Sequence, residues 1–218
     1  MLVLSHRGIG APAPENTLEA FDHVARAGAD GVETDVRLSA DGALVLVHDR
    51  VLPDGRPVAD APRSEIERGL GHVVPTAAEA LEAFPALLWN LEIKTREVVP
   101  ALLALLVARS PRTRILLTSF HHDVIERIGP LPGVLRGVLV AHRPFRAAGE
   151  PLGWWPRSQA PDAIVWDYET LDDAAVRTAV ARGIQNFAYG PRTRDEHERC
   201  RSLALTGVIT DDVGQAHP

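Results

Sequence analysis

Residues 28–36 read Gly-Ala-Asp-Gly-Val-Glu-Thr-Asp-Val and join the end of a helix to a buried strand. Apolar side chains recur at helical spacing over 17–27, and Gly28 provides the usual stop signal. The strand that follows covers 31–36. Residues two apart on a strand share a face, so Glu33 and Asp35 lie on one side of it and Val32 and Val36 on the other.

The same alternation of helix and strand continues along the whole chain. We expect further buried strands near 2–5, 87–93, 114–117, 134–140, 163–165, 184–188 and 207–209. Helical patterns cover 76–83, 98–108, 123–128, 172–182 and 196–203. Eight strands separated by helices favour an α/β fold of the parallel (β/α)8 TIM-barrel type. A doubly wound open sheet is the alternative, because a strand count alone does not close a barrel.

Two segments depart from this alternation. Asp41-Gly42 predicts a hairpin turn leading into an extra strand at 44–47. Residues 49–75, rich in proline, glycine and charge, are then expected to form a small insertion with one short helix. Residues 141–161 read as a long loop, in which Trp154 and Trp155 are candidates for lining a substrate mouth. We expect residues 1–218 to form a single domain.

Composition excludes several classes of protein. The chain has 218 residues, 45% of them hydrophobic, which is too apolar for a disordered protein. Its net charge of -6 argues against a nucleic-acid partner. A single cysteine, Cys200, excludes an internal disulfide and is expected to be a packing residue. No targeting segment or membrane-length apolar run is visible, so we expect a cytoplasmic protein without a membrane anchor. The oligomeric state is not indicated.

Charged residues cluster on two strands that are expected to be central. Asn90, Glu92 and Lys94 share one face of their strand, as Glu33 and Asp35 do of theirs. Buried carboxylates are costly unless they are paired. Lys94, the only lysine among 23 lysines and arginines, offsets one of the three negative charges. The remaining excess of two matches a divalent cation, and oxygen ligands favour Mg²⁺ or Ca²⁺ over zinc.

Two histidines stand at the ends of predicted strands beside this acidic cluster. His6 ends the first strand and His48 ends the hairpin strand, so both are candidates for a general acid and a general base. Arg7 and Lys94 add cations that suit a phosphate. A metal, two cations and two imidazoles together indicate phosphate-ester chemistry. Surface or loop positions are predicted for five other histidines: His23, His72, His142, His197 and His217.

The order of these motifs resembles the glycerophosphodiester phosphodiesterase family over nearly the whole chain. The matching pieces are His6-Arg7-Gly8, Pro14-Glu15-Asn16-Thr17, the 28–36 stretch, Asp41-Gly42, His48-Asp49, Pro75-Thr76 with Glu79-Ala80-Leu81, Asn90-Leu91-Glu92-Ile93-Lys94, Ser119-Phe120 and Gly207-Val208-Ile209-Thr210-Asp211. Each piece alone is a weak signal, but the order and the spacing together are specific.

The resemblance implies a TIM barrel that hydrolyses small glycerophosphodiesters to an alcohol and glycerol 3-phosphate. It implies that Glu33, Asp35 and Glu92 hold a divalent cation, Ca²⁺ or Mg²⁺. His6 and His48 would be the acid–base pair of a route through a cyclic phosphate, with the role of each in the first step left open. Arg7 and Lys94 would hold the phosphate.

Two departures from the family pattern affect the expected substrate. The family usually has a Trp-Thr-Val-Asn run after the seventh strand, where this chain has Phe187-Ala188-Tyr189-Gly190-Pro191. Tyr189, or else Phe187, is expected to supply the aromatic side chain to the substrate. The insertion after His48-Asp49 is also short. Two alternative functions are a lysophospholipase D-like activity on lysolipids and a catalytically idle barrel that binds phosphorylated ligands.

Overall fold

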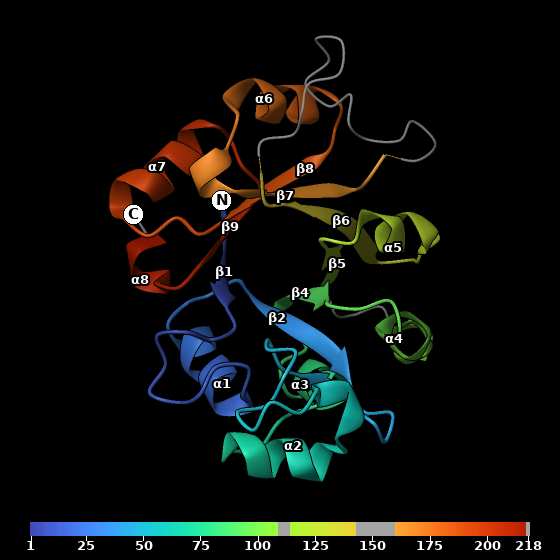
Figure 1. Ribbon diagram of the computed structural model, residues 1–218. Helices are drawn as coiled ribbons and strands as arrows, with labels where there is room; N and C mark the ends of the chain where they lie inside the picture. The colour runs from blue at the N-terminus through green and yellow to red at the C-terminus, as the bar shows by residue number, and fades with distance from the viewer. Residues whose placement is uncertain (109–113, 143–159, 217–218) are drawn as a thin grey trace.

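The barrel predicted from the strand count is closed in the computed structural model, which describes residues 1–108, 114–142 and 160–216. Eight parallel strands form a ring in which β1 pairs with both β2 and β9 (Figure 1). In order around the ring they are β1 (Leu2–His6), β2 (Gly31–Leu38), β4 (Leu88–Ile93), β5 (Arg114–Ser119), β6 (Val134–Val140), β7 (Ala163–Asp167), β8 (Gln185–Tyr189) and β9 (Gly207–Thr210). The closing pair of β1 and β9 excludes the open sheet.

Helices surround this ring on its outer side (Figure 1). They are α1 (Leu18–Arg26), α3 (Ala77–Ala83), α4 (Val98–Val107), α5 (His122–Arg127), the 3-10 helix η2 (Tyr168–Thr170), α6 (Asp173–Ala181), α7 (Arg194–Ser202) and α8 (Val213–Ala216). Threonine side chains cap three of them, at Thr17, Thr76 and Thr193. No helix among the described residues is both long enough and apolar enough to cross a membrane.

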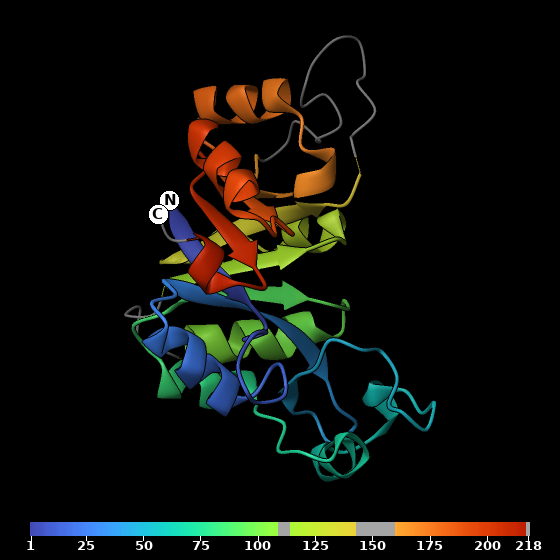
Figure 2. The same ribbon diagram turned by 90° about the vertical axis from the view of Figure 1, so that its left-hand side faces the viewer.

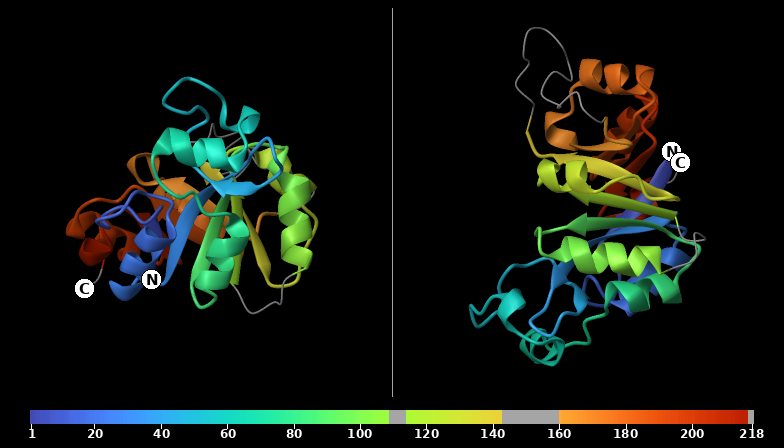
Figure 3. Two further views of the ribbon diagram at one scale, coloured as in Figure 1. Left: turned by 90° about the horizontal axis from the view of Figure 1, so that it is seen from below. Right: turned by 90° about the vertical axis from the view of Figure 1, so that its right-hand side faces the viewer.

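The hairpin and the insertion form a small unit of their own. β3 (Leu44–Leu46) pairs antiparallel with β2, as the Asp41-Gly42 turn predicts. The 3-10 helix η1 (Val58–Asp60) and α2 (Arg63–Leu70) follow it, and a separate apolar cluster includes Val45, Val58 and Ile66. Figures 2 and 3 show this unit at the end of the barrel to which the strand arrowheads point.

The interior of the barrel is divided into an apolar and a polar part. Leu4, Leu88, Leu116, Val165, Phe187 and Ile209 belong to one buried cluster at the apolar end. Residues two positions further along the same strands share their face. Those residues are His6, Asn90, Thr118, Asp167, Tyr189 and Asp211. On each of these six strands the inner face therefore changes from apolar to polar within one step toward the carboxyl end.

One expectation about single residues is wrong, and others fall outside the structure. His197 was predicted at the surface but is fully buried in α7, where its ring contacts the Thr193 carbonyl oxygen at 2.6 Å and Thr210 Oγ1 at 3.1 Å. Most residues of α7 are polar, so the sequence does not indicate that His197 faces inward. Cys200 is a buried packing residue, as expected. Trp154, Trp155 and His217 lie outside the described residues.

Close packing of β2 against β4 makes Gly31 a sensitive position. A Cβ at Gly31 would stand 2.2 Å from the Leu88 carbonyl oxygen. We expect Gly31→Ala to lower the free energy of unfolding by about 1–3 kcal/mol, the usual effect of overpacking, as measured by urea denaturation. Gly69→Ala is the matched control, because its Cβ would meet Leu52 at 3.6 Å and helix propensity favours alanine. Equal stability of the two variants would contradict this account.

Candidate active site

Three buried carboxylates meet at the carboxyl ends of β2 and β4. The register places Asp35 opposite Glu92 and Glu33 opposite Asn90, so the inward faces predicted for the two strands face the same space. One oxygen of Glu33, of Asp35 and of Glu92 lies within 4.8 Å of the others. All three side chains are buried, which makes their mutual repulsion strong.

Two cations hold the central carboxylate of this cluster. Lys94 Nζ lies 2.8 Å from Asp35 Oδ1 and 2.7 Å from Glu92 Oε1. Arg7 Nε lies 3.1 Å from Asp35 Oδ2, and Asn16 Nδ2 donates a hydrogen bond of 3.0 Å to the same oxygen. Burial acts to raise the pKa of Asp35, but Lys94 and Arg7 outweigh it and keep the pKa below the ordinary value. Asp35 is therefore ionised.

Glu33 lacks such compensation. Burial raises its pKa well above the ordinary value, and the charges of Asp35 and Glu92 raise it further. No described residue donates a hydrogen bond to its buried Oε2. Burial also raises the pKa of Glu92, although Lys94 acts in the opposite direction. An all-oxygen cluster with excess negative charge and an unsatisfied buried oxygen fits a divalent cation of the Mg²⁺ or Ca²⁺ type.

The two histidines resemble each other in their local contacts. His6 Nδ1 lies 2.6 Å from Asp211 Oδ1, and its Nε2 lies 3.8 Å from Glu33 Oε2. His48 Nδ1 lies 2.9 Å from Asp49 Oδ1. A carboxylate at Nδ1 favours the tautomer that carries its proton there. In each ring Nε2 is then available to exchange a proton with another group.

The first loop is fastened directly to β2. Arg7 N donates to the Glu33 carbonyl oxygen at 2.8 Å, and Asn16 N donates to the Arg7 carbonyl oxygen at 2.7 Å. Arg7 and Asn16 both have a left-handed backbone, with φ of 56° and 57°. This conformation is uncommon for residues other than glycine and is found where surrounding structure enforces it. It directs both side chains to Asp35.

The structure distinguishes the two aromatic candidates of β8. Phe187 is 1% exposed and belongs to the apolar cluster inside the barrel. Tyr189 lies at the polar end, packs edge-to-face on Phe120 with ring centroids 6.3 Å apart, and is hydrogen-bonded to Asp167. Burial and Asp167 raise the pKa of Tyr189, so its hydroxyl stays protonated. Tyr189 is therefore the one of the two that can face a ligand.

Two residues in this arrangement were given no role by the sequence interpretation. Asn16 is 3% exposed, and its side chain links Asp35 to Thr34 by accepting a 2.6 Å hydrogen bond from Thr34 Oγ1. Asp211 contacts His6 from 205 residues away in the chain. The motifs that contain these two residues were identified in the sequence, and Asp211 follows the last predicted strand. Only the closure of β1 on β9 brings it to His6.

Comparisons with known proteins agree on one family. The model of the Glycerophosphoryl diester phosphodiesterase family matches residues 6–215. A Glycerophosphodiester phosphodiesterase of Caldanaerobacter subterraneus subsp. tengcongensis is 28% identical over 233 residues, which cover 97% of this chain and 94% of the relative.

Two solved structures have the same architecture. The glycerophosphodiester phosphodiesterase of Thermotoga maritima has a TM-score of 0.78 and 29% identity, covering 97% of this chain and 94% of its own. A phosphodiesterase of Oleispira antarctica, solved in complex with the product sn-glycerol-3-phosphate, has a TM-score of 0.82 and 25% identity, covering 97% and 93%.

The carboxylate cluster predicts that added cation stabilises the protein. We expect millimolar Ca²⁺ or Mg²⁺ to raise the melting temperature. A ligand present at a hundred times its Kd adds about 2.7 kcal/mol to the free energy of unfolding. Glu33→Gln should lose most of this rise while Glu82→Gln, on an exposed side chain of α3, keeps it. Differential scanning calorimetry with EDTA and metal add-back measures both. An equal rise in the two variants would refute the site.

Without metal, Glu33 and Asp35 should affect stability in opposite directions. The folded-state pKa of Glu33 is raised, so its ionisation destabilises the fold as pH rises through that pKa. The pKa of Asp35 is lowered, so its contribution is present above the unfolded-state pKa and is lost as pH falls. In EDTA at pH 7, Glu33→Gln should raise the melting temperature. Asp35→Asn should cost about 3–5 kcal/mol, because Lys94 and Arg7 lose the buried negative charge that they share. Shifts of the same sign would contradict this assignment.

Proposed function

The chain belongs to the glycerophosphoryl diester phosphodiesterase family, and on that premise we propose that it hydrolyses glycerophosphodiesters to an alcohol and glycerol 3-phosphate. It is an enzyme of the phosphoric diester hydrolase class. One observation carries the proposal: the buried acidic cluster and His6, with its carboxylate partner, converge at the carboxyl end of the barrel. Ligands of this fold bind at that end. We treat residues 1–218 as one catalytic domain.

Glu33, Asp35 and Glu92 are proposed to hold the divalent cation. When bound, the cation supplies positive charge that polarises a phosphoryl oxygen. Support comes from the unsatisfied Glu33 oxygen and from the all-oxygen donor set, which suits Mg²⁺ and Ca²⁺ alike. Neutralising the cluster also removes the repulsion that three carboxylates would exert on an anionic phosphodiester.

His6 and His48 are proposed to transfer the protons. In the first step Nε2 of one ring takes the proton of the glycerol 2-hydroxyl, whose oxygen bonds to phosphorus. The phosphorus–alkoxide bond breaks, and the other ring donates a proton to the departing oxygen. The resulting cyclic phosphate is opened by water with the two roles exchanged. Asp211 and Asp49 would fix the tautomers and stabilise the imidazolium that forms in each step.

Arg7, Lys94 and Tyr189 are proposed to bind the substrate. Lys94 has three N–H donors, of which two point at Asp35 and Glu92. The third remains for a phosphate oxygen beside the cluster. Arg7 lies across Asp35 from Lys94 and also contacts Glu15 at 3.3 Å. Tyr189 offers its ring and its hydroxyl from β8.

The histidine roles are tested by single substitutions. We expect His6→Ala and His48→Ala each to lower kcat by at least ~100-fold, the effect of losing a general acid–base group, with glycerophosphocholine as substrate. His72→Ala, at a partly exposed position of the insertion, is the control and should keep full activity. Wild-type turnover in either catalytic variant would exclude that residue from proton transfer.

Lys94→Arg tests whether a compact ammonium is needed. Lys94 is confined between two carboxylates with 12% of its side chain exposed. A guanidinium is longer and planar, so it cannot place one donor between Asp35 and Glu92 and another on phosphate in the same way. We expect kcat/KM to fall at least ~10-fold, which corresponds to the loss of one charge-assisted hydrogen bond to the substrate. Unchanged kinetics would refute this role.

A substrate panel with EDTA and metal add-back tests the function itself. Glycerophosphocholine, glycerophosphoethanolamine and glycerophosphoglycerol should release glycerol 3-phosphate only with metal present. Lysophosphatidylcholine included in the panel would release lysophosphatidic acid if the activity is lysophospholipase D-like. Failure to cleave any of the four with Mg²⁺ or Ca²⁺ would favour a barrel that only binds phosphorylated ligands.

A further inference from the structure

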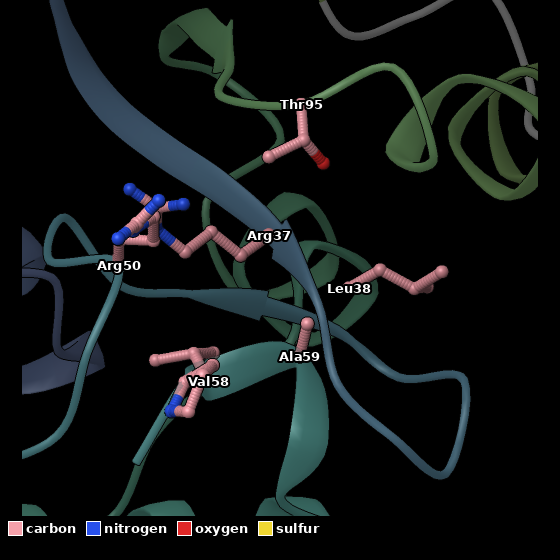
Figure 4. A pocket seen from close by; sticks show the side chains of 7 residues that line it. Arg37, Leu38, Arg50, Val58, Ala59 and Thr95 are labelled. Carbon is pink, nitrogen blue, oxygen red and sulfur yellow. The ribbon is translucent and has the colours of Figure 1, made fainter. Parts of the chain in front are cut away.

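A cavity with two arginines in its lining lies between the insertion and the segments at the carboxyl ends of β2 and β4. It has a volume of about 300 Å³ and is lined by Arg37, Leu38, Arg50, Pro57, Val58, Ala59 and Thr95 (Figure 4). These residues come from the carboxyl end of β2, the segment after β4 and the insertion around η1. Neither arginine has a role in the proposed proton transfers.

Arg37 connects this cavity to the proposed catalytic groups. It follows Asp35 by two residues on β2, so it shares the inner face of that strand and lies one step nearer the mouth. Its Nε and Nη2 donate hydrogen bonds of 3.0 and 2.6 Å to the His48 carbonyl oxygen. The guanidinium therefore holds the backbone of His48 in place, and Arg37 also lines the cavity.

Arg50 is the second arginine that lines this cavity. It is exposed, and its carbonyl oxygen accepts a 3.0 Å hydrogen bond from Val58 N, which fastens its backbone to the insertion. Both arginines line the cavity, and their head groups overlap in the view of Figure 4. Among the described acidic residues, none forms an ion pair within 4.0 Å with Arg37 or Arg50. Burial and the charge of Arg50 lower the pKa of Arg37, whereas Asp35, Glu92 and Asp49 act to raise it. An anion between the two guanidiniums would reduce the repulsion between Arg37 and Arg50.

The rest of the lining is mostly apolar. Leu38, Val58 and Ala59 supply hydrocarbon surface, and Thr95, the residue after Lys94, supplies a hydroxyl. Elsewhere at the carboxyl end of the barrel Phe120 and Tyr189 form an aromatic pair. The two substituents of a phosphodiester bound at the carboxylates would thus meet different surroundings.

We propose that the Arg37–Arg50 cavity is the subsite for the leaving alcohol and that it selects alcohols carrying a phosphate or carboxylate group. The inference rests on the proposed function, since it presupposes that the scissile phosphate binds at Glu33, Asp35 and Glu92. The alcohol would lie along the apolar wall, with its anionic end at the two guanidiniums.

Two diesters that differ in one phosphate group provide the test. Glycerophosphoglycerol is compared with the same diester bearing a phosphate on the far hydroxyl of the alcohol. At low ionic strength the wild-type enzyme should have a kcat/KM about tenfold higher for the phosphorylated diester, the value of one charge-assisted hydrogen bond. The preference should arise in KM and shrink as salt is added.

Variants of Arg50 separate charge recognition from the positioning of His48. Arg50→Ala should reduce the preference about tenfold and Arg50→Glu should reverse it. Arg68→Ala, an exposed arginine of α2 outside the cavity, is the matched control and should retain it. Circular dichroism establishes that each variant is folded. A carboxylated alcohol in place of the phosphorylated one should show the same pattern.

The outcomes distinguish this inference from the proposed function. Equal kcat/KM values for the two diesters in the wild-type enzyme would overturn the subsite and leave the hydrolysis standing. So would an equal loss of preference in the Arg50 and Arg68 variants. If neither diester nor glycerophosphocholine is cleaved in the presence of metal, the proposed function itself fails.

Discussion

The arrangement of this molecule depends on the repulsion among three buried carboxylates. In a parallel barrel two neighbouring strands in register bring their inward side chains together, and here these are Asp35 and Glu92. Lys94, Arg7 and Asn16 all contact Asp35. The first loop adopts a left-handed backbone to bring two of these groups into place. Burial and the neighbouring carboxylates keep the pKa of Glu33 well above its ordinary value, and the proposed cation would supply the charge that offsets this repulsion.

Much of the fold follows from local pattern. The period-two alternation at Glu33 and Asp35 and at Asn90, Glu92 and Lys94 predicted which faces point inward, and the structure has the corresponding register. Glycine at the end of the first helix and Asp41-Gly42 before β3 marked turns that the structure contains. Closure of the ring was the step that needed a pairing between residues far apart in sequence, β1 with β9.

The residues that sequence reasoning left without a role have partners that are distant in the chain or that contact the main chain. Asp211 reaches His6 only because the ring closes. Arg37 donates a hydrogen bond to a main-chain carbonyl oxygen. Every residue has such an oxygen, so the sequence does not indicate which one is the partner. His197 sits in a helix whose composition is strongly polar, so one inward histidine is indistinguishable from its neighbours. Period and composition report which face is apolar, whereas these contacts depend on tertiary geometry.

The hairpin that carries His48 is not part of the barrel. It is held to β2 by three residue pairs, and while Leu44 and Leu46 pack in the main core, Val45 and Val47 belong to a separate apolar cluster. Small units of this kind open at lower free energy than the structure to which they are attached. We therefore expect the hairpin to open on heating before the barrel melts. Such opening would displace His48, a proposed proton carrier, while every barrel strand remains paired, so a more rigid hairpin would extend the working temperature without a change in the barrel.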